Sequence, residues 1–296
     1  MTDKTKRRFG DRRDGKLVSA PGLQTVMTAL MPKRTEAEVY LSDKLDATEL
    51  VKWLDEQNKD KPKEERITIF HCAITGLVRM VRERPLMNRF IQGYRIYERN
   101  EISVAFVAKR RFVDGTEESL MFMVPEETDT VFDISRKIIG DVSEMRKSEH
   151  ATGGIDELLD KFAALPRVAL AGSVRLIRYL DFWGINPKFL TDGDPNYSSI
   201  FVSNLGSIKC PSVYHHLNNY GTNSMMITIG TLHKEEILMD DGHKEIRDVI
   251  DIGATLDERI ADGFYFARSL KLIKHIFENP KLLEQPLNHP SEFDYK

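Results

Sequence analysis

The feature of this 296-residue chain that most constrains its fold is a long apolar stretch, split by a turn, near the C-terminal end. Residues 223–256 read NSMMITIGTLHKEEILM, DDGH and KEIRDVIDIGATL. β-Branched residues on both sides of an Asp-Gly pair are typical of an antiparallel hairpin, because the turn needs a residue that tolerates positive φ. We therefore predict a hairpin over Asn223–Leu256 with Asp241-Gly242 as its turn.

Helical and strand patterns alternate irregularly along the rest of the chain. Apolar residues at helical spacing predict helices, and dense β-branched and aromatic content predicts strands. The predicted helices are Asp46–Gln57, Ile67–Pro85, Thr130–Lys147 and Gly263–Glu278. The predicted strands are a pair within Phe90–Phe112 broken at Glu98–Glu101, then Ser119–Glu126 and Tyr197–Ile208. Without a regular βαβ order, the simplest fold class is one α/β domain with a mixed sheet.

The segment Asp156–Ile185 is the most apolar region, and we expect a helical segment broken at Pro166. Leu165, Ala169, Gly172, Leu176, Leu180 and Trp183 form one predicted stripe, with Arg167, Arg175 and Arg178 off it. A buried or subunit-contact helix is the preferred interpretation, and a basic helix lying on a membrane is the alternative. About residues 150–195 are expected to be an added segment within a domain at 21–285. Residues 1–20 are expected to be a loosely held basic arm, and 286–296 a tail.

Composition excludes several classes of function. The net charge of −3 gives no field of one sign for a nucleic-acid partner. The two cysteines, Cys72 and Cys210, predict reduced thiols in a cytoplasmic protein. No apolar run reaches the roughly 18 residues that span a membrane, so no transmembrane segment is expected. His71 and Cys72 are expected to pack in the core.

The common catalytic motifs are missing from the sequence. It has no phosphate-binding glycine loop, no His-Glu-x-x-His and no Gly-x-Ser-x-Gly elbow. His215 and His216 are adjacent, so their side chains should point in different directions on regular backbone, and no further metal ligands can be identified. We therefore expect no metal.

One corner has the form of a catalytic strand, turn and helix. DERIADGFYFARSL, from Asp257 to Leu270, turns at Asp262-Gly263 into an apolar helix. Its first six residues offer Asp257, Glu258, Arg259 and Asp262 as polar groups, with no histidine, cysteine or serine. The residues alone do not say which chemistry such a corner performs.

Several stretches, in order, resemble a known family. They are LDATELVKWLDE, RERPLMNRFI, ISVAFVAKRR, SIFVSNLGSI and DERIADGFYFARSLKLIKHIFENPKLL. Together they resemble the catalytic domain of the acyltransferase subunits of 2-oxo acid dehydrogenase complexes, over most of Met31–Leu283. The resemblance is weakest over about 148–196. It implies a two-layer α/β sandwich of the chloramphenicol acetyltransferase type.

The resemblance also implies a homotrimer with active sites between subunits, where coenzyme A or acyl-CoA meets a small-molecule acyl acceptor. The family motif is His-x-x-x-Asp-Gly, whose His is the general base and whose Asp supports local structure. A serine in Ser-Asn-Leu-Gly donates to the tetrahedral oxyanion. Ser203 and Asp262 match these residues, and Glu258 stands at the His position.

Two interpretations of Glu258 stay open. In the first, Glu258 is a weaker base in an acyltransferase and acts on a thiol, an amine or an alcohol. In the second, Glu258 marks a pseudoenzyme that is kept as a trimeric scaffold. Ser203 has a bland interpretation too, because a serine before Asn-Leu-Gly often satisfies turn backbone. Nothing upstream resembles a lipoyl domain, so we expect a free-standing catalytic domain that carries no lipoyl arm.

Overall fold

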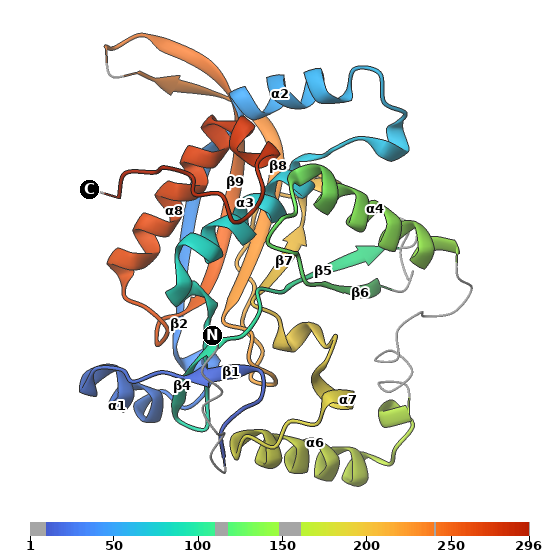
Figure 1. Ribbon diagram of the computed structural model, residues 1–296, viewed down its shortest axis with the longest axis vertical. Helices are drawn as coiled ribbons and strands as arrows, with labels where there is room; N and C mark the ends of the chain where they lie inside the picture. The colour runs from blue at the N-terminus through green and yellow to red at the C-terminus, as the bar shows by residue number, and fades with distance from the viewer. Residues whose placement is uncertain (1–9, 110–117, 148–160, 240, 296) are drawn as a thin grey trace.

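The computed structural model describes residues 10–109, 118–147, 161–239 and 241–295 (Figure 1). Its main sheet has six strands in the order β2-β9-β8-β7-β5-β6, and a smaller sheet has the order β1-β4-β3. The main strands are β2 (Glu38–Asp46), β5 (Val104–Lys109), β6 (Glu118–Met123), β7 (Ile200–Asn204), β8 (Met225–Leu238) and β9 (Lys244–Asp257). The smaller sheet consists of β1 (Gly15–Leu17), β3 (Arg89–Gln92) and β4 (Arg95–Arg99).

The predicted hairpin is confirmed. β8 and β9 pair antiparallel from Met225↔Leu256 to Leu238↔Lys244, with an irregularity between Ile229 and Leu232. β2 extends this sheet antiparallel to β9, whereas β7 pairs parallel with both β8 and β5. The sheet is therefore mixed, as predicted.

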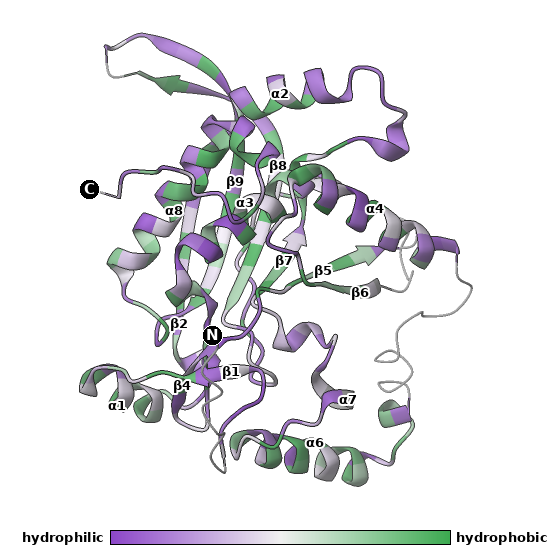
Figure 2. Ribbon diagram, viewed as in Figure 1, coloured by the Kyte–Doolittle hydropathy of each residue, from purple (hydrophilic) through white to green (hydrophobic). Residues whose placement is uncertain are grey.

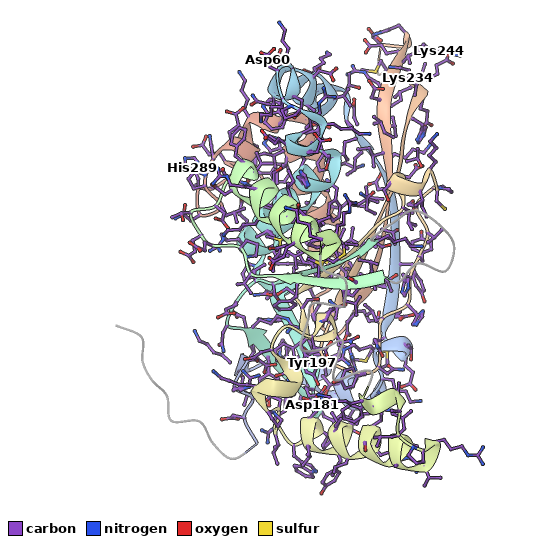
Figure 3. All side chains as sticks on the ribbon, turned by 90° about the vertical axis from the view of Figure 1, so that its right-hand side faces the viewer. Asp60, Asp181, Tyr197, Lys234, Lys244 and His289 are labelled. Carbon is purple, nitrogen blue, oxygen red and sulfur yellow. The ribbon has the colours of Figure 1, made fainter. Side chains whose placement is uncertain are left out.

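Helices cover one face of this sheet and make the fold a two-layer α/β sandwich (Figures 1 and 3). The layer consists of α2 (Thr48–Asn58), α3 (Ile69–Glu83), α4 (Val131–Lys147) and α8 (Gly263–Glu278). These helices fall where the sequence predicts them. The central helix α3 is buried from His71 to Val81 because both its neighbours and the sheet contact it. Hydrophobic residues concentrate in α3 and the strands behind it (Figure 2).

Further helices lie outside this layer among the described residues. They are α1 (Gly22–Leu30), α6 (Arg167–Phe182) and α7 (Lys188–Thr191), with single turns at Arg34–Glu36, Lys63–Glu65, Pro85–Asn88, Pro195–Tyr197, Gly206–Ile208 and Pro280–Glu284. No helix among the residues that the structure describes is long and apolar enough to cross a membrane.

The prediction for Phe90–Phe112 is wrong in its count of strands. The described part of this stretch holds three strands, and the first two are joined at Gly93 and Tyr94, which both have positive φ. Glu98 and Arg99 belong to β4, and the second break follows them. The sequence signal was weak because a lone glycine with a tyrosine is an uncommon hairpin turn.

The prediction of a loosely held arm is wrong for residues 10–17, and residues 1–9 lie outside the described residues. β1 pairs with β4, and Arg12 is 1% exposed. The tail also packs onto the domain: the Leu287 amide donates to the Asp129 carbonyl, and Ser291 bonds to Glu83. Specific polar contacts hold both ends, and such contacts leave no periodic pattern in a sequence.

The sequence analysis prefers a buried or subunit-contact helix for Asp156–Ile185, and burial within a single chain is wrong for the described part, which begins at Lys161. The helix begins after Pro166 as predicted, but Val168 is 79% exposed and Tyr179 62%. Much of α6 is hydrophobic (Figure 2). Of the α6 side chains, only that of Asp181 is buried. The subunit-contact and membrane interpretations stay predictions.

Candidate active site

Ser203 stands near the end of β7, in the middle of the mixed sheet. The β7 pleat buries Ile200 and Val202 in the core, while Phe201 and Ser203 point to the opposite face. The part of the chain that the structure describes contains no hydrogen-bond partner for the Ser203 hydroxyl. The bland interpretation, a serine that satisfies turn backbone, therefore loses its support.

The turn after Ser203 is instead held by Asn204 and Gly206. The Asn204 side-chain oxygen accepts from the Ser207 amide at 3.2 Å. A Cβ at Gly206 would lie 2.6 Å from the Gly230 carbonyl oxygen on β8, so only glycine fits there. This contact fixes the turn against the hairpin and leaves the Ser203 hydroxyl available to a ligand.

Ser203 borders a cavity of about 930 Å³. Its lining includes Asn204, His215 and His216 close to Ser203 in the sequence, and Ile138 and Arg146 from α4. The volume lies near the upper end of the range for small-molecule sites, about 300–1,000 Å³. The arrangement offers a hydroxyl, amides and imidazoles to a bound molecule.

His215 and His216 stack on each other, with ring centroids 4.9 Å apart and planes inclined by 20°. The expectation that they point in different directions holds for regular backbone only, and residues 211–218 are neither helix nor strand. The His215 Nδ1 is 3.0 Å from the His216 carbonyl oxygen. Both histidines are exposed, and the sequence analysis leaves them out of the site because histidines in a loop are more often surface or hydrogen-bonding residues.

His71 and Cys72 are buried in α3, as predicted. His71 borders the same cavity and its Nδ1 lies 2.9 Å from the Ser135 hydroxyl. Burial lowers the pKa of His71 to about 4, so its ring is neutral at pH 7. Burial raises the pKa of the Cys72 thiol, and both cysteines are free thiols, as predicted.

Glu258 lies at a different place, on the corner that follows β9. Its amide donates to the Ala37 carbonyl at 2.9 Å, and its side chain is exposed. Within the described ranges, the Glu258 carboxylate has no hydrogen-bond or ion-pair partner. This carboxylate is therefore free to contact another molecule.

A buried ion pair supports the corner beneath Glu258. The Asp257 carboxylate accepts from the Arg259 guanidinium at 2.7 and 2.6 Å, and the two residues are 0% and 2% exposed. Asp262 caps α8, since its carboxylate accepts from the Tyr265 amide at 2.7 Å. The predicted turn and cap are thus confirmed.

One chain does not bring Ser203 and Glu258 together. Ser203 pairs with Thr228 and Thr228 with Gly253, so the two residues are two strands and five positions apart. With about 3.3 Å per residue and about 4.8 Å per strand, that is roughly 20 Å. A site that used both residues would need two chains.

Among the described residues, no group of three or more His, Cys, Asp or Glu side chains is placed to hold a metal ion. The polar groups of the cavity and the corner include hydroxyls, amides, imidazoles, carboxylates and basic side chains. Their chemistry is proton transfer and hydrogen bonding to a developing oxyanion.

Comparison with known families gives a match over two stretches. The model of the 2-oxoacid dehydrogenases acyltransferase (catalytic domain) family matches residues 16–115 and 188–284. The matched stretches include Ser203, Glu258 and Asp262. The unmatched stretch, 116–187, contains α4 and α6.

The lipoamide acyltransferase component of the branched-chain alpha-keto acid dehydrogenase complex of Bacillus subtilis (strain 168) is a relative in sequence. It is 20% identical over 271 residues, which cover 89% of this chain and 52% of the relative. The chain therefore spans about half the length of this curated relative.

Solved structures share the fold. A probable dihydrolipoamide acetyltransferase from Listeria monocytogenes 4b F2365 has a TM-score of 0.59 and 16% identity, covering 95% of this chain and 98% of that one. The cubic core of a pyruvate dehydrogenase multienzyme complex has a TM-score of 0.57 and 11% identity, with coverages of 91% and 94%. A chloramphenicol acetyltransferase has a TM-score of 0.53 and 11% identity, with coverages of 89% and 99%. The predicted fold type is confirmed.

Proposed function

The chain belongs to the family of 2-oxoacid dehydrogenase acyltransferase catalytic domains, and we propose that it moves an acyl group between coenzyme A and a thiol or other small acceptor. The observation that carries the proposal is the Ser203 hydroxyl, unpaired within the described residues and open to a cavity of about 930 Å³. Because Ser203 and Glu258 of one chain are far apart, the proposed site combines Ser203 of one copy with Glu258 of another.

In the proposed reaction, the acceptor thiol attacks the carbonyl carbon of the acyl-CoA thioester. The Glu258 carboxylate takes the thiol proton as the new C–S bond forms. The Ser203 hydroxyl donates to the oxyanion of the tetrahedral intermediate, which then expels coenzyme A as a thiolate. The proton held on Glu258 passes to that thiolate, so that protons balance and the carboxylate returns to its starting state.

Glutamate is a weaker base than histidine for this step. A free Glu has a pKa of about 4.3 against about 6.5 for His, which costs up to roughly 3 kcal/mol toward a thiol of pKa about 8.5. Burial between two copies would raise the Glu258 pKa and recover part of this loss. Glu258 is exposed in the single chain, so a second copy that packs against it would bury it.

The second candidate is a scaffold or binding protein of the same fold without catalysis. It is favoured by the Glu258 carboxylate, which no other described side chain orients for proton transfer. A general base is usually held by a hydrogen bond from a further group. A pseudoenzyme would keep the trimer and lose this constraint.

Three variants distinguish the candidates in an assay with acetyl-CoA and a dithiol acceptor. If Glu258 is the base, Glu258→Gln lowers acyl transfer at least tenfold. Glu278→Gln, an exposed carboxylate at the end of α8, is the matched control and keeps the native rate. Glu258→His rebuilds the family motif and should equal or exceed the native rate, since imidazole suits thiol chemistry at neutral pH.

The outcomes separate as follows. A native protein that is inactive but gains activity as Glu258→His is a pseudoenzyme on an intact scaffold. A folded protein that is inactive in all forms and binds no coenzyme A contradicts the acyltransferase proposal. Light scattering at micromolar concentration tests assembly, and a stable monomer would exclude the two-copy site.

A further inference from the structure

Four guanidinium groups are buried at the end of the molecule where α6 meets the N-terminal segment. Arg12 is 1% exposed, Arg34 5%, Arg99 8% and Arg259 2%. Buried cations are normally paired with carboxylates or fully hydrogen-bonded. The contacts of these four arginines therefore show whether a counter-ion is missing.

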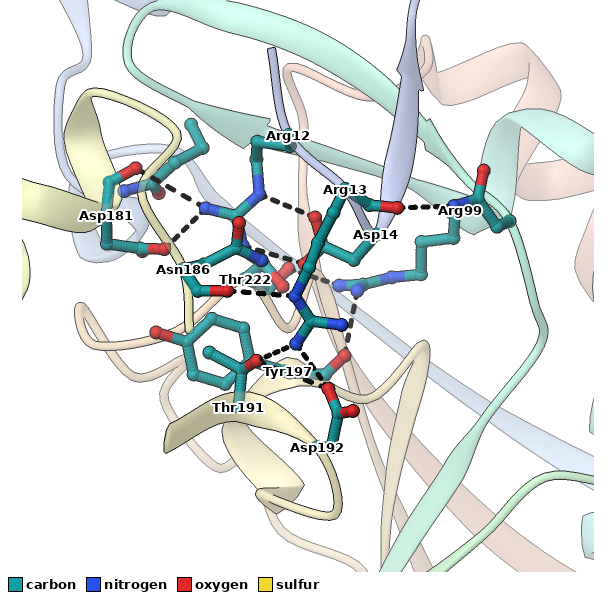
Figure 4. A network of polar contacts seen from close by, with 12 residues as sticks. Arg12, Arg13, Asp14, Arg99, Asp181, Asn186, Thr191, Asp192, Tyr197 and Thr222 are labelled. Carbon is teal, nitrogen blue, oxygen red and sulfur yellow. Dashed lines mark hydrogen bonds and ion pairs between the residues drawn. The ribbon is translucent and has the colours of Figure 1, made fainter. Parts of the chain in front are cut away.

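Three of the four are well satisfied. Arg12 pairs with Asp14 at 2.7 Å and with Asp181 at 2.5 Å (Figure 4). Arg99 donates to the carbonyls of Tyr197 and Thr222 at 2.8 and 2.6 Å (Figure 4). Arg259 has its two bonds to Asp257, described above. Each of these three groups makes at least two short hydrogen bonds, although Arg99, like Arg34, forms no ion pair with a described carboxylate.

Arg34 differs from the others. Its one short bond goes from Nη2 to the Ile91 carbonyl at 3.0 Å, and the next contact, to the Gln92 side chain, is 3.5 Å. Its Nε is buried without any hydrogen-bond partner, and no ion pair joins it to a described carboxylate. Desolvation lowers the Arg34 pKa to about 10, yet the group stays charged at pH 7. Arg34 is therefore a buried positive charge without a direct ion-pair partner among the described residues, and the Asp257 and Asp181 carboxylates act on it only from beyond ion-pair distance.

A small cavity of about 120 Å³ adjoins Arg34. Four cationic residues line it, namely Lys33, Arg34, Arg178 and Arg259, and its lining contains one carboxylate, Asp181. Asp181 is already paired with Arg12, and Arg259 with Asp257. Arg178 comes from α6 and has no partner within the described residues. The charges left uncompensated at the cavity are thus mainly those of Arg34 and Arg178.

We propose that this cavity binds a compact oxyanion, a phosphate, sulfate or short carboxylate, which bridges Arg34 and Arg178. Guanidinium groups are the side chains best suited to such oxyanions, since their N–H donors match the spacing of the oxygens. The volume is well below the roughly 300 Å³ at which sites for larger ligands begin, so a nucleotide does not fit. Arg178 lies in the stretch 116–187 that the family model does not match. Ser203 does not line this cavity, whereas Arg259 does and directly follows Glu258, so the cavity adjoins the Glu258 corner and not the Ser203 cavity.

The experiment uses thermal unfolding and titration calorimetry with inorganic phosphate and with acetate, at ionic strength held constant with chloride. Native protein should show saturable binding and a Tm that rises with the anion, because a ligand that binds only the folded state stabilises it. Phosphate and acetate as separate arms tell which oxyanion class fits better. If neither anion binds saturably, the proposal fails.

Arg178→Gln and Arg175→Gln form a matched pair, because both residues are exposed on α6 and only Arg178 lines the cavity. We expect anion affinity to fall at least tenfold in Arg178→Gln and to change less than twofold in Arg175→Gln. Equal losses in both would point to general surface charge and overturn the site.

Arg34→Met gives a second test from the buried side. It removes the uncompensated charge and keeps a similar volume, so the fold should persist while saturable anion binding is lost. A folded Arg34→Met protein that binds phosphate or acetate like the native protein would overturn the proposal. If this variant does not fold, the matched pair on α6 decides.

Discussion

The proposed site has two halves that are built differently. We call the end of β7 with its following turn, residues Ser203–Ser207, the Ser203 wall, and residues Asp257–Asp262 the Glu258 corner. Ser203 stands beside a large cavity, and strand register and a glycine contact fix the turn after it. Glu258 stands exposed above a buried ion pair, with no described partner for its side chain. Backbone geometry holds the first half, and buried electrostatics holds the second.

This difference indicates which changes each half tolerates. The Ser203 wall depends on close packing, so only residues that fit the available space are tolerated there, as the contact at Gly206 shows. The corner depends on Asp257, Arg259 and the Asp262 cap, none of which requires a particular residue at position 258. A change from His to Glu at that position therefore leaves the fold of the corner intact.

The largest predicted effect comes from breaking the ion pair of the corner. Arg259→Met leaves Asp257 buried without its partner and should lower the free energy of unfolding by about 3–5 kcal/mol. The double variant with Asp257→Asn should recover part of this loss. Urea denaturation measures both, with the exposed Lys271→Met on α8 as control. A loss below about 1 kcal/mol would show that the corner does not depend on this pair.

Ser203→Ala tests the other half. The proposal predicts a fall in acyl transfer of about 10²–10³-fold, or about 2.7–4 kcal/mol in the transition state, with unfolding unchanged. Ser19→Ala, at an exposed serine away from this cavity, is the control. An unchanged rate in Ser203→Ala would remove this residue from the mechanism.

The free energy of unfolding should depend on pH through His71, which borders the cavity beside the Ser203 wall and has a lowered pKa. The unfolded chain binds this proton below about pH 6.5 and the folded chain only near pH 4. Stability is therefore full above pH 6.5 and falls as the pH drops toward 4, by about 3 kcal/mol at most. His71→Asn should flatten this slope in denaturation curves from pH 7.5 to 4.5. The same slope in variant and native protein would assign the loss to other groups.

The smallest predicted effect is at the helix cap. Asp262→Ala removes the acceptor for the Tyr265 amide and should cost about 0.5–2 kcal/mol of stability. Asp262→Asn keeps an acceptor and should cost less. Thermal unfolding compares the two, and equal losses would mean that charge, not capping, stabilises this turn.

Local signals account for what the sequence predicted well. The turn at Asp241-Gly242 and the helix Gly263–Glu278 are determined by residues close together in the sequence, so the sequence pattern predicts them. The three-strand arrangement at 89–109 and the stacking of His215 on His216 depend on backbone that follows no period. The arm was misjudged because Arg12 is held by Asp181, which a sequence pattern does not connect to it.

The candidate site was predicted only as far as the resemblance reached. Ser203, Glu258 and Asp262 were named from motifs, and their roles stay predictions. The cavity, and the place of His71, His215 and His216 around it, could not be predicted because the cavity is assembled from segments between Glu64 and Met226. The exposure of α6 escaped prediction because an apolar stripe on a helix does not say whether the chain itself covers it.

The contact between Arg12 and Asp181 spans 169 residues of sequence and has a consequence for synthesis in the cell. At roughly 5–20 residues per second, a ribosome needs about 8–34 s to add the segment between them. The segment around Arg12 and β1 is made before its two partners, first β4 and then, well after it, α6. The segment around Arg12 therefore waits until more than half of the chain has been made, and the Arg12 guanidinium stays in water until α6 arrives.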